Sequence, residues 1–225
     1  MKKKSTLYFG LLVNLIPVFM LYIIPFLICI FISFSEGLYD FVPRGLVNYS
    51  SVLSDKRFLL ATKNNIGFVV IGVTLNMALS IVISFVLHRI KFPIYIKVIF
   101  ILPLAIPSFT VTGFFRIFFG EAYLNIVGTL ATRYTVLLLY LWKSIGINIL
   151  ILTLALYKID KSVVEAAEID GAGYFTRVKD IMLPLISRTI TFVLFVSLIN
   201  SLSVYKDVQL LYGDYPEKGV YMLQH

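Results

Sequence analysis

Charged residues are scarce in this sequence. Only 14% of its 225 residues are Asp, Glu, Lys or Arg, whereas 59% are hydrophobic and the mean hydropathy is +0.92. Soluble domains usually carry about 25% charged residues. A chain with so few charges cannot cover a surface that faces water, which excludes an ordinary soluble globular protein. The composition is typical of a membrane protein.

Cysteine and histidine are nearly absent as well. The single cysteine, Cys29, excludes an internal disulfide and a zinc cluster, and we expect it to be a small packing residue. The two histidines, His88 and His225, are too few for a convincing metal or nucleophile site. The sequence also lacks a glycine loop ending in G-K-[ST], so it should not bind ATP. No catalytic residue, cofactor or metal site is predicted.

Positive charge is in excess, with a formal net charge of +8. The basic residues are scattered between apolar segments and do not form a patch. This distribution argues against a nucleic-acid partner and is typical of residues that flank membrane spans.

Five long apolar segments predict an all-α, polytopic membrane protein. A span needs roughly 20 mostly apolar residues, and its backbone must satisfy its own hydrogen bonds, so each segment is predicted to be a helix. The predicted segments are Leu7–Phe34, Ile66–Leu87, Ile94–Phe119, Thr135–Tyr157 and Ile186–Val204.

The third segment contains two prolines, Pro103 and Pro107. Proline lacks an N–H donor and crowds the preceding turn, so this helix is predicted to be kinked or locally broken. The kink can serve packing alone, or it can flex during function.

The basic start, Lys2 to Lys4, predicts an N-terminus in the cytoplasm. The apolar run that follows is too long for a signal peptide, whose apolar region has about 7–15 residues. We therefore expect a multi-pass protein of the bacterial cytoplasmic membrane. Five spans would leave the C-terminal stretch outside, and we expect a sixth span after His225.

The cytoplasmic loop 158–187 reads as two short helices with a tight corner. Ser162 and Glu165 have the spacing of a capping box, and Asp170-Gly171 is a helix stop signal. A second helix is predicted from Tyr174 to Met182, ending near Leu183-Pro184. Small residues and carboxylates at such a corner suit the docking of a partner, although a loop lying along the bilayer would look similar.

The same loop resembles the EAA motif of type I ATP-binding-cassette importer permeases. That motif reads approximately E-A-A-x-x-D-G-A and, further on, I-x-L-P. The residues that match it in identity and spacing are Glu165, Ala166, Ala167, Asp170, Gly171, Ala172, Ile181, Leu183 and Pro184. The resemblance implies that the first short helix is a coupling helix, which inserts into a cleft on a cytoplasmic ATPase.

Weaker similarities extend over most of the chain and favour the carbohydrate branch of that family (maltose and glycerol-phosphate permeases). They include Asn48-Tyr49, Leu102-Pro103 and Trp142 to Gly146. Two positions depart from the family pattern, because Asp160 replaces a frequent proline and Val178 a frequent phenylalanine. The resemblance implies a single permease domain over residues 1–225 that pairs with a second homologous permease, two ATPase subunits and an extracytoplasmic solute-binding protein.

Polar residues within the spans are candidates for a solute path, because they are costly in lipid. Each can instead make a hydrogen bond between helices. Asn148 and Asn200 are selected for the path because they lie on the segments that flank the loop 158–187, and Lys143 is expected to extend toward the outer interface. The full set is Asn14, Asn76, Lys143, Asn148, Asn200 and Ser201.

The alternative function is an ion-coupled secondary transporter. Such a protein needs buried carboxylates in its spans to hold the coupling ion. In this sequence each Asp and Glu is predicted to lie in a loop or near the end of a span. The predicted function is therefore an importer permease for a sugar or related solute, driven by partner ATPases.

Overall fold

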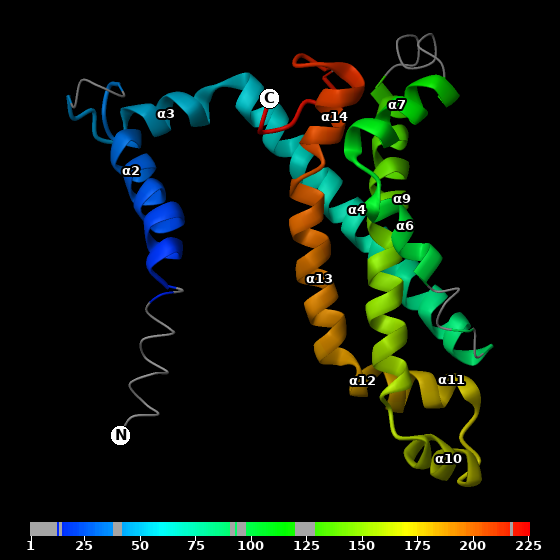
Figure 1. Ribbon diagram of the computed structural model, residues 1–225. Coiled ribbons are helices and arrows are strands. Elements are labelled where there is room, and N and C mark those ends of the chain that lie inside the picture. The colour runs from blue at the N-terminus through cyan, green and yellow to red at the C-terminus, as the bar shows by residue number, and fades with distance from the viewer. Residues whose placement is uncertain are drawn as a thin grey trace, which may run out of the picture. The chain divides into compact units, whose positions relative to one another are not determined.

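The computed structural model describes residues 13, 15–37, 42–90, 93, 98–119, 129–216 and 218–225 (Figure 1). Helices make up most of this part, and its one β-bridge joins Ser35 to Pro43. The all-α prediction is confirmed. The chain divides into two compact units, Met1–Leu59 and Leu60–His225, which are described separately.

The first unit contains η1 (Phe19–Ile23), α2 (Ile24–Ser33) and α3 (Val47–Ser54). The stretch Leu15–Ser33 is long and apolar enough to cross a membrane, and none of it is buried in the protein. Cys29 is exposed on α2, so the prediction that it packs inside the protein is wrong. Apolar side chains of this kind suit the hydrocarbon of a bilayer.

Asn48 ties α3 back to the end of α2. Its amide nitrogen donates to the carbonyl oxygens of Ser33 and Ser35, at 3.0 and 2.8 Å. The Tyr49 ring lies 5.3 Å from that of Phe34, and an ion pair joins Arg44 to Glu36. These contacts close the loop between the two helices.

The second unit is built on three long helices. They are α4 (Lys56–Arg89), which begins just before the unit boundary, α9 (Thr129–Tyr157) and α13 (Ser187–Leu202). Their shared apolar core consists of Val73, Met77, Phe85, Leu152, Leu156, Met182, Ile186 and Val193. Four helical stretches of the described residues meet the length and hydropathy of a membrane span: Leu15–Ser33, Lys56–Arg89, Thr132–Tyr157 and Ser187–Tyr212.

The third predicted span is broken, as its prolines indicated. It consists of η2 (Val98–Ile101), α6 (Leu102–Ala105) and α7 (Ser108–Phe119), with the break at Ile106-Pro107. Residues 94–97 of the predicted segment lie outside the described residues. Because each piece is short, no single helix among the described residues 98–119 is long enough to span a membrane.

The fifth predicted span is longer than expected. After a turn at Ser203-Val204 the chain continues as α14 (Tyr205–Tyr212). The following stretch folds back onto the helices: the Asn64 amide donates to the carbonyl oxygens of Lys218 and Tyr221, at 2.7 and 2.9 Å. In this unit, α7 and α14 lie at the end opposite to α10 and α11 (Figure 1).

Candidate functional site

The loop 158–187 begins with α10 (Lys161–Ile169), which is capped by Asp160. The Asp160 carboxylate accepts a hydrogen bond from the backbone N–H of Ser162 at 3.0 Å, and this bond lowers the pKa of Asp160. The predicted capping box of Ser162 and Glu165 is therefore wrong, because the helix begins earlier and Asp160 supplies the oxygen acceptor that a cap needs. The departure from the family pattern at Asp160 thus has a local structural role.

The corner after α10 is formed as predicted. Gly171 has a φ of +83°, a conformation that favours glycine. Its N–H donates to the Glu168 carbonyl oxygen at 3.1 Å, and the Ala172 N–H donates to that of Ala167 at 2.9 Å. This is the Schellman pair of bonds, which satisfies the last carbonyl groups of a helix. The chain reverses direction here within a few residues.

The second helical part is less regular than predicted. It consists of α11 (Tyr174–Arg177), the π-helical turn η3 (Val178–Met182) and α12 (Leu183–Leu185). Helix therefore continues past the predicted end at Leu183-Pro184. Pro184 crowds the carbonyl group four residues before it, that of Asp180. The π-helical turn η3 contains Asp180, and its wider backbone makes room for the proline ring. The same arrangement occurs in η1, which precedes Pro25.

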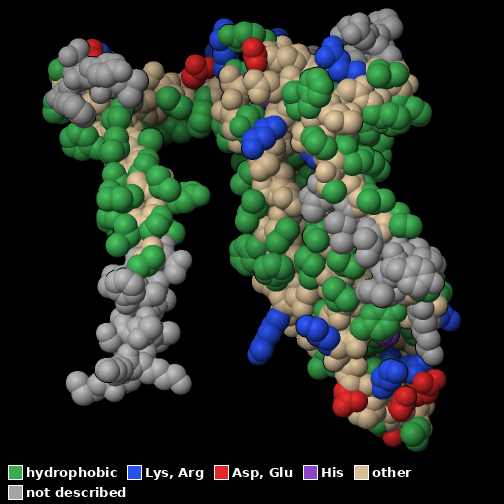
Figure 2. Space-filling model, in the orientation of Figure 1, with side chains coloured by type: hydrophobic (Ala, Val, Ile, Leu, Met, Phe, Trp, Pro, Cys, Tyr) green, Lys and Arg blue, Asp and Glu red, His purple; other side chains and the backbone are tan. Residues whose placement is uncertain are grey.

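The tip of the loop exposes both carboxylates and large apolar side chains. Glu165, Ala166, Asp170 and Gly171 are exposed, while Ala167, Ala172 and Leu183 are half-buried and Pro184 is exposed. Ile169 and Phe175 are 86% and 84% exposed. Figure 2 shows acidic and basic side chains gathered around this end of the unit, below a mostly hydrophobic middle. Ile169 was not among the predicted site residues, although a large apolar residue between two carboxylates, those of Glu168 and Asp170, was a usable signal.

Two side-chain contacts hold the loop in shape. Arg177 pairs with Glu168 across the corner at 2.5 Å. The Arg89 guanidinium, at the end of α4, lies 4.7 Å from the centre of the Tyr174 ring. At the base of the loop, Met182 and Ile186 are buried in the core of α4, α9 and α13. The loop is therefore a preformed projection whose base is part of the helix core.

A buried polar network joins the same three helices. The Asn148 amide nitrogen of α9 donates to Asn76 Oδ1 of α4 at 2.6 Å and to Ser197 Oγ of α13 at 2.8 Å. The Asn76 amide nitrogen donates to Ser144 Oγ at 2.5 Å, and Tyr140 Oη donates to the Ser197 carbonyl oxygen at 3.0 Å. These bonds set the register of α4, α9 and α13.

The two residues selected for a solute path differ in their surroundings. Asn148 is fully buried within the network, whereas Asn200 is half-buried. Asn76 also lies in the network, and the Ser201 hydroxyl donates to the Leu198 carbonyl oxygen at 2.7 Å. Asn14 lies outside the described residues. The contacts of Asn148 join helices, and its place on a solute path stays a prediction.

We expect Asn148→Ala to lower the free energy of unfolding by about 1–2 kcal/mol, since it removes two hydrogen bonds to buried groups on two other helices. Measurements on membrane proteins average about 0.6 kcal/mol per bond, and this side chain makes two. Thermal unfolding in detergent measures the loss. Asn200→Ala is the matched control and should leave the unfolding temperature unchanged. Equal unfolding temperatures for the two variants would show that the network does not stabilise the fold.

Lys143 does not extend to the outer interface, so that expectation is wrong. Its ammonium nitrogen lies 2.8 and 2.9 Å from the two carboxylate oxygens of Asp207 and 2.8 Å from Ser108 Oγ. Asp207 is 5% exposed and belongs to α14, within the helical stretch Ser187–Tyr212. Asp207 thus lies near the end of a helical stretch, as predicted, but it is buried among the helices and paired with a lysine.

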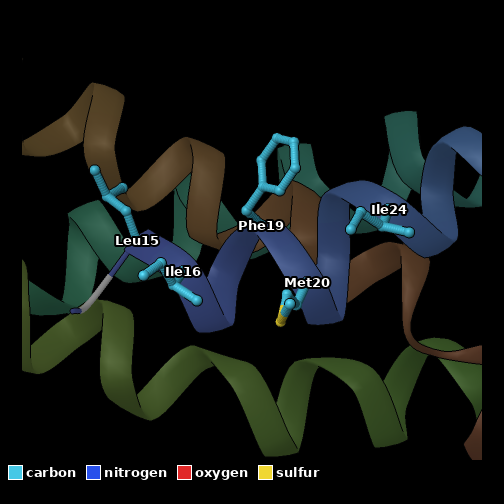
Figure 3. A pocket seen from close by; sticks show the side chains of 5 residues that line it. All are labelled: Leu15, Ile16, Phe19, Met20 and Ile24. Atoms are coloured by element: carbon cyan, nitrogen blue, oxygen red, sulfur yellow. The ribbon is translucent and has the colours of Figure 1, made fainter. Parts of the chain in front are cut away.

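An apolar groove of about 380 Å³ runs along η1 and the start of α2 (Figure 3). It is lined by Leu15, Ile16, Phe19, Met20 and Ile24. These side chains offer a polar solute no hydrogen-bond donor and only the weak acceptor of the Met20 sulfur, so the groove suits a hydrocarbon chain. Within the described residues, no three His, Cys, Asp or Glu side chains are grouped so that they could hold a metal ion.

The sequence matches a family model described as "Binding-protein-dependent transport system inner membrane component" over residues 79–205, more than half of the chain. It is 26% identical to the trehalose/maltose transport system permease protein MalF of Thermococcus litoralis, over 95% of this chain and 79% of that protein. It is 29% identical to the arabinooligosaccharides transport system permease protein AraP of Halalkalibacterium halodurans, over 72% of this chain and 57% of that protein.

A third relative is the sn-glycerol-3-phosphate transport system permease protein UgpA of Yersinia pseudotuberculosis, 30% identical over 69% of this chain and 58% of that protein. The chain thus spans a little over half the length of AraP and UgpA. A chain in the crystal structure of a bacterial alginate ABC transporter, bound to an alginate pentasaccharide-loaded periplasmic protein, has the same fold. The TM-score is 0.81 at 20% identity, over 98% of this chain and 81% of that chain.

Proposed function

The chain belongs to the family of binding-protein-dependent transport system inner membrane components, and on that premise we propose that it is the transmembrane permease subunit of an ATP-binding-cassette importer. The solute is a sugar or a related compound, because the relatives are named for trehalose and maltose, arabinooligosaccharides and glycerol 3-phosphate. The permease carries the solute path, and partner subunits hydrolyse ATP.

The observation that carries the proposal is the shape of the loop 158–187. Its Schellman corner at Gly171 presents Glu165 and Asp170 beside the exposed Ile169 and Phe175. Carboxylates can pair with basic groups of an ATPase, and the apolar side chains gain stability when its surface covers them. A loop that only lies along the bilayer would not need a preformed corner held by the Glu168–Arg177 ion pair.

The structure supports a route from this loop to the spans. The loop connects α9 to α13, and these helices are joined to each other and to α4 by the buried polar network. Movement of the loop by a closing ATPase would therefore move the three helices together. Alternating access by rigid-body motion is the expected mechanism.

The family implies further partners: two ATPase subunits, a second homologous permease and an extracytoplasmic solute-binding protein. The described helices offer wide apolar faces to lipid and to a second permease. The cytoplasmic position of the N-terminus and of the loop 158–187, the single domain 1–225 and the solute path at Asn148 and Asn200 also belong to this proposal.

An ion-coupled secondary transporter is disfavoured by the pairing of Asp207. A carboxylate that holds a coupling cation must be free to exchange it, and both oxygens of Asp207 bond the Lys143 ammonium. Asp207, the one buried carboxylate among the described residues, is therefore paired with a lysine and not available to a coupling cation in this state.

Glu165→Lys is expected to abolish recovery of the permease with its ATPase, because it places a positive charge where the proposed contact needs a negative one. Co-purification of the full-length permease with its candidate ATPase measures this. Asp214→Lys makes the same charge change at the opposite end of the unit and should leave recovery unchanged. If no ATPase accompanies the wild type, the proposed function loses its mechanism and transport driven by an ion gradient becomes the next assay.

A further inference from the structure

The buried contact of Lys143 joins three elements at one point. Lys143 comes from α9, Asp207 from α14, and Ser108 is the first residue of α7, directly after the break at Pro107. The ammonium group has three acceptors at 2.8 to 2.9 Å, as many as it has hydrogens. The broken third segment therefore meets the C-terminal helix through a charge on α9.

The contact lies where the middle of α9 meets α7 and α14, toward the end of the unit opposite α10 and α11 (Figure 1). Lys143 is the central residue of α9, which has 29 residues, so it lies about 21 Å from either end at about 1.5 Å per residue. The Lys143 side chain remains 19% exposed, while that of Asp207 is 8% exposed. Apolar packing of Leu211 with Val111, Phe115 and Leu139 holds α14 against α7 and α9 beside the contact. The pair thus lies at the margin of a dry interface, within reach of water if that interface opens.

Such a pair contributes little net stability. The cost of removing two charges from water offsets most of their attraction in a low-dielectric interior. When the helices part and water enters, both ions recover their hydration, so the ion pair itself costs little to open. An apolar contact behaves differently, because exposing it to water is always unfavourable. The contact between Lys143 and Asp207 therefore adds little to the cost of opening this interface, unlike the apolar contacts of Leu211 beside it.

We propose that the Lys143–Asp207 contact is the switching contact of the permease. It is closed when α14 packs on α7 and α9, and it opens when the transport cycle admits water between these elements. The polar network of α4, α9 and α13 has no comparable access to water, since its members Asn76, Asn148 and Ser197 are all 0% exposed. The three long helices consequently stay together while the interface with α7 and α14 changes. This inference rests on the proposed function.

The test replaces the pair by apolar residues of similar size, Lys143→Met with Asp207→Leu. This variant keeps the packing but removes the benefit of hydration, so it should favour the closed state. We expect about tenfold lower solute-stimulated ATPase activity and transport in proteoliposomes that contain the permease complex and its binding protein, with thermal stability equal to or above wild type. The charge exchange Lys143→Asp with Asp207→Lys should recover most of the activity.

Spin labels provide a readout that a purely structural role would not change. Labels at Leu138→Cys on α9 and Lys206→Cys on α14, in a Cys29→Ser background, should show two distances in the charged protein. Trapping with ATP and vanadate should shift the population from one distance to the other. The apolar double variant should show a single distance with and without trapping. If the double variant transports at the wild-type rate and still shows two distances, the proposal that this contact switches is overturned. A wild-type complex whose ATPase does not respond to solute would overturn the proposed function instead.

Discussion

Gly146→Ala is expected to remove most of the folded permease, because the position has no room for a side chain. A Cβ atom at Gly146 would lie 1.5 Å from the carbonyl oxygen of Phe100 and 2.5 Å from its carbonyl carbon. These are backbone atoms of η2, so no side-chain rotation relieves the overlap, and the broken segment must move away from α9. Overpacking a core typically costs about 1–3 kcal/mol, and we expect the upper end of that range or beyond.

The yield of monodisperse protein after detergent extraction measures this effect. Each 1.4 kcal/mol is about a tenfold change in the folded fraction of a marginal protein, so a loss of about 3 kcal/mol should lower the yield by about a hundredfold. Gly67→Ala in α4 is the matched control, since no atom lies within 4 Å of its Cβ position. It should match or slightly exceed the wild-type yield, because alanine favours helix more than glycine does. Equal yields for both variants would refute the close approach of η2 to α9.

Gly171→Val is expected to lower recovery of the ATPase by about tenfold or more while the spans stay folded. The left-handed conformation costs most residues about 1–2 kcal/mol, and a β-branched residue more. Because valine disfavours the φ of +83° found at Gly171, the corner should open. The last turn of α10 should then lose the hydrogen bonds that the N–H groups of residues 171 and 172 donate to its carbonyl groups. Co-purification with the ATPase and the ATPase rate of the complex measure the effect.

Two controls separate the backbone conformation from the mere presence of a side chain. Gly171→Asn should retain much of the binding, because asparagine tolerates this conformation better than other residues. Gly173→Ala should retain nearly all of it, since Gly173 has a φ of −63° and open space around its Cβ position. Binding of Gly171→Val at the wild-type level would show that the corner does not position the coupling surface.

Local patterns predicted the loop 158–187 well. The stop at Asp170-Gly171 and the start of a second helix at Tyr174 are confirmed, because they depend on bonds between residues a few positions apart. The errors were also local: Asp160 competes with Ser162 for the cap, and helix continues through Pro184 because the backbone widens before it. Sequence alone cannot decide between two adjacent caps that differ little in energy.

Long-range contacts were the part that sequence could not predict. Lys143 and Asp207 are 64 residues apart, and Asn148 and Asn76 are 72 apart. In the sequence each is a polar residue in or near an apolar segment, and it could line a solute path, bond a neighbouring helix or lie at the membrane interface. The outcome depends on which faces of the helices meet, and this is a property of the whole packed unit.

Composition and short patterns thus determined that the protein lies in a membrane, that it is helical, that its third segment breaks at a proline, and that one loop forms a tight corner. These features follow from solvation and from bonds within a turn of the chain, which the sequence states directly. The tertiary structure decided that Gly146 must be glycine, that Asn148 joins three helices and that Lys143 has an acidic partner. Those outcomes depend on close packing between distant segments, where a displacement of an ångström changes which atoms meet.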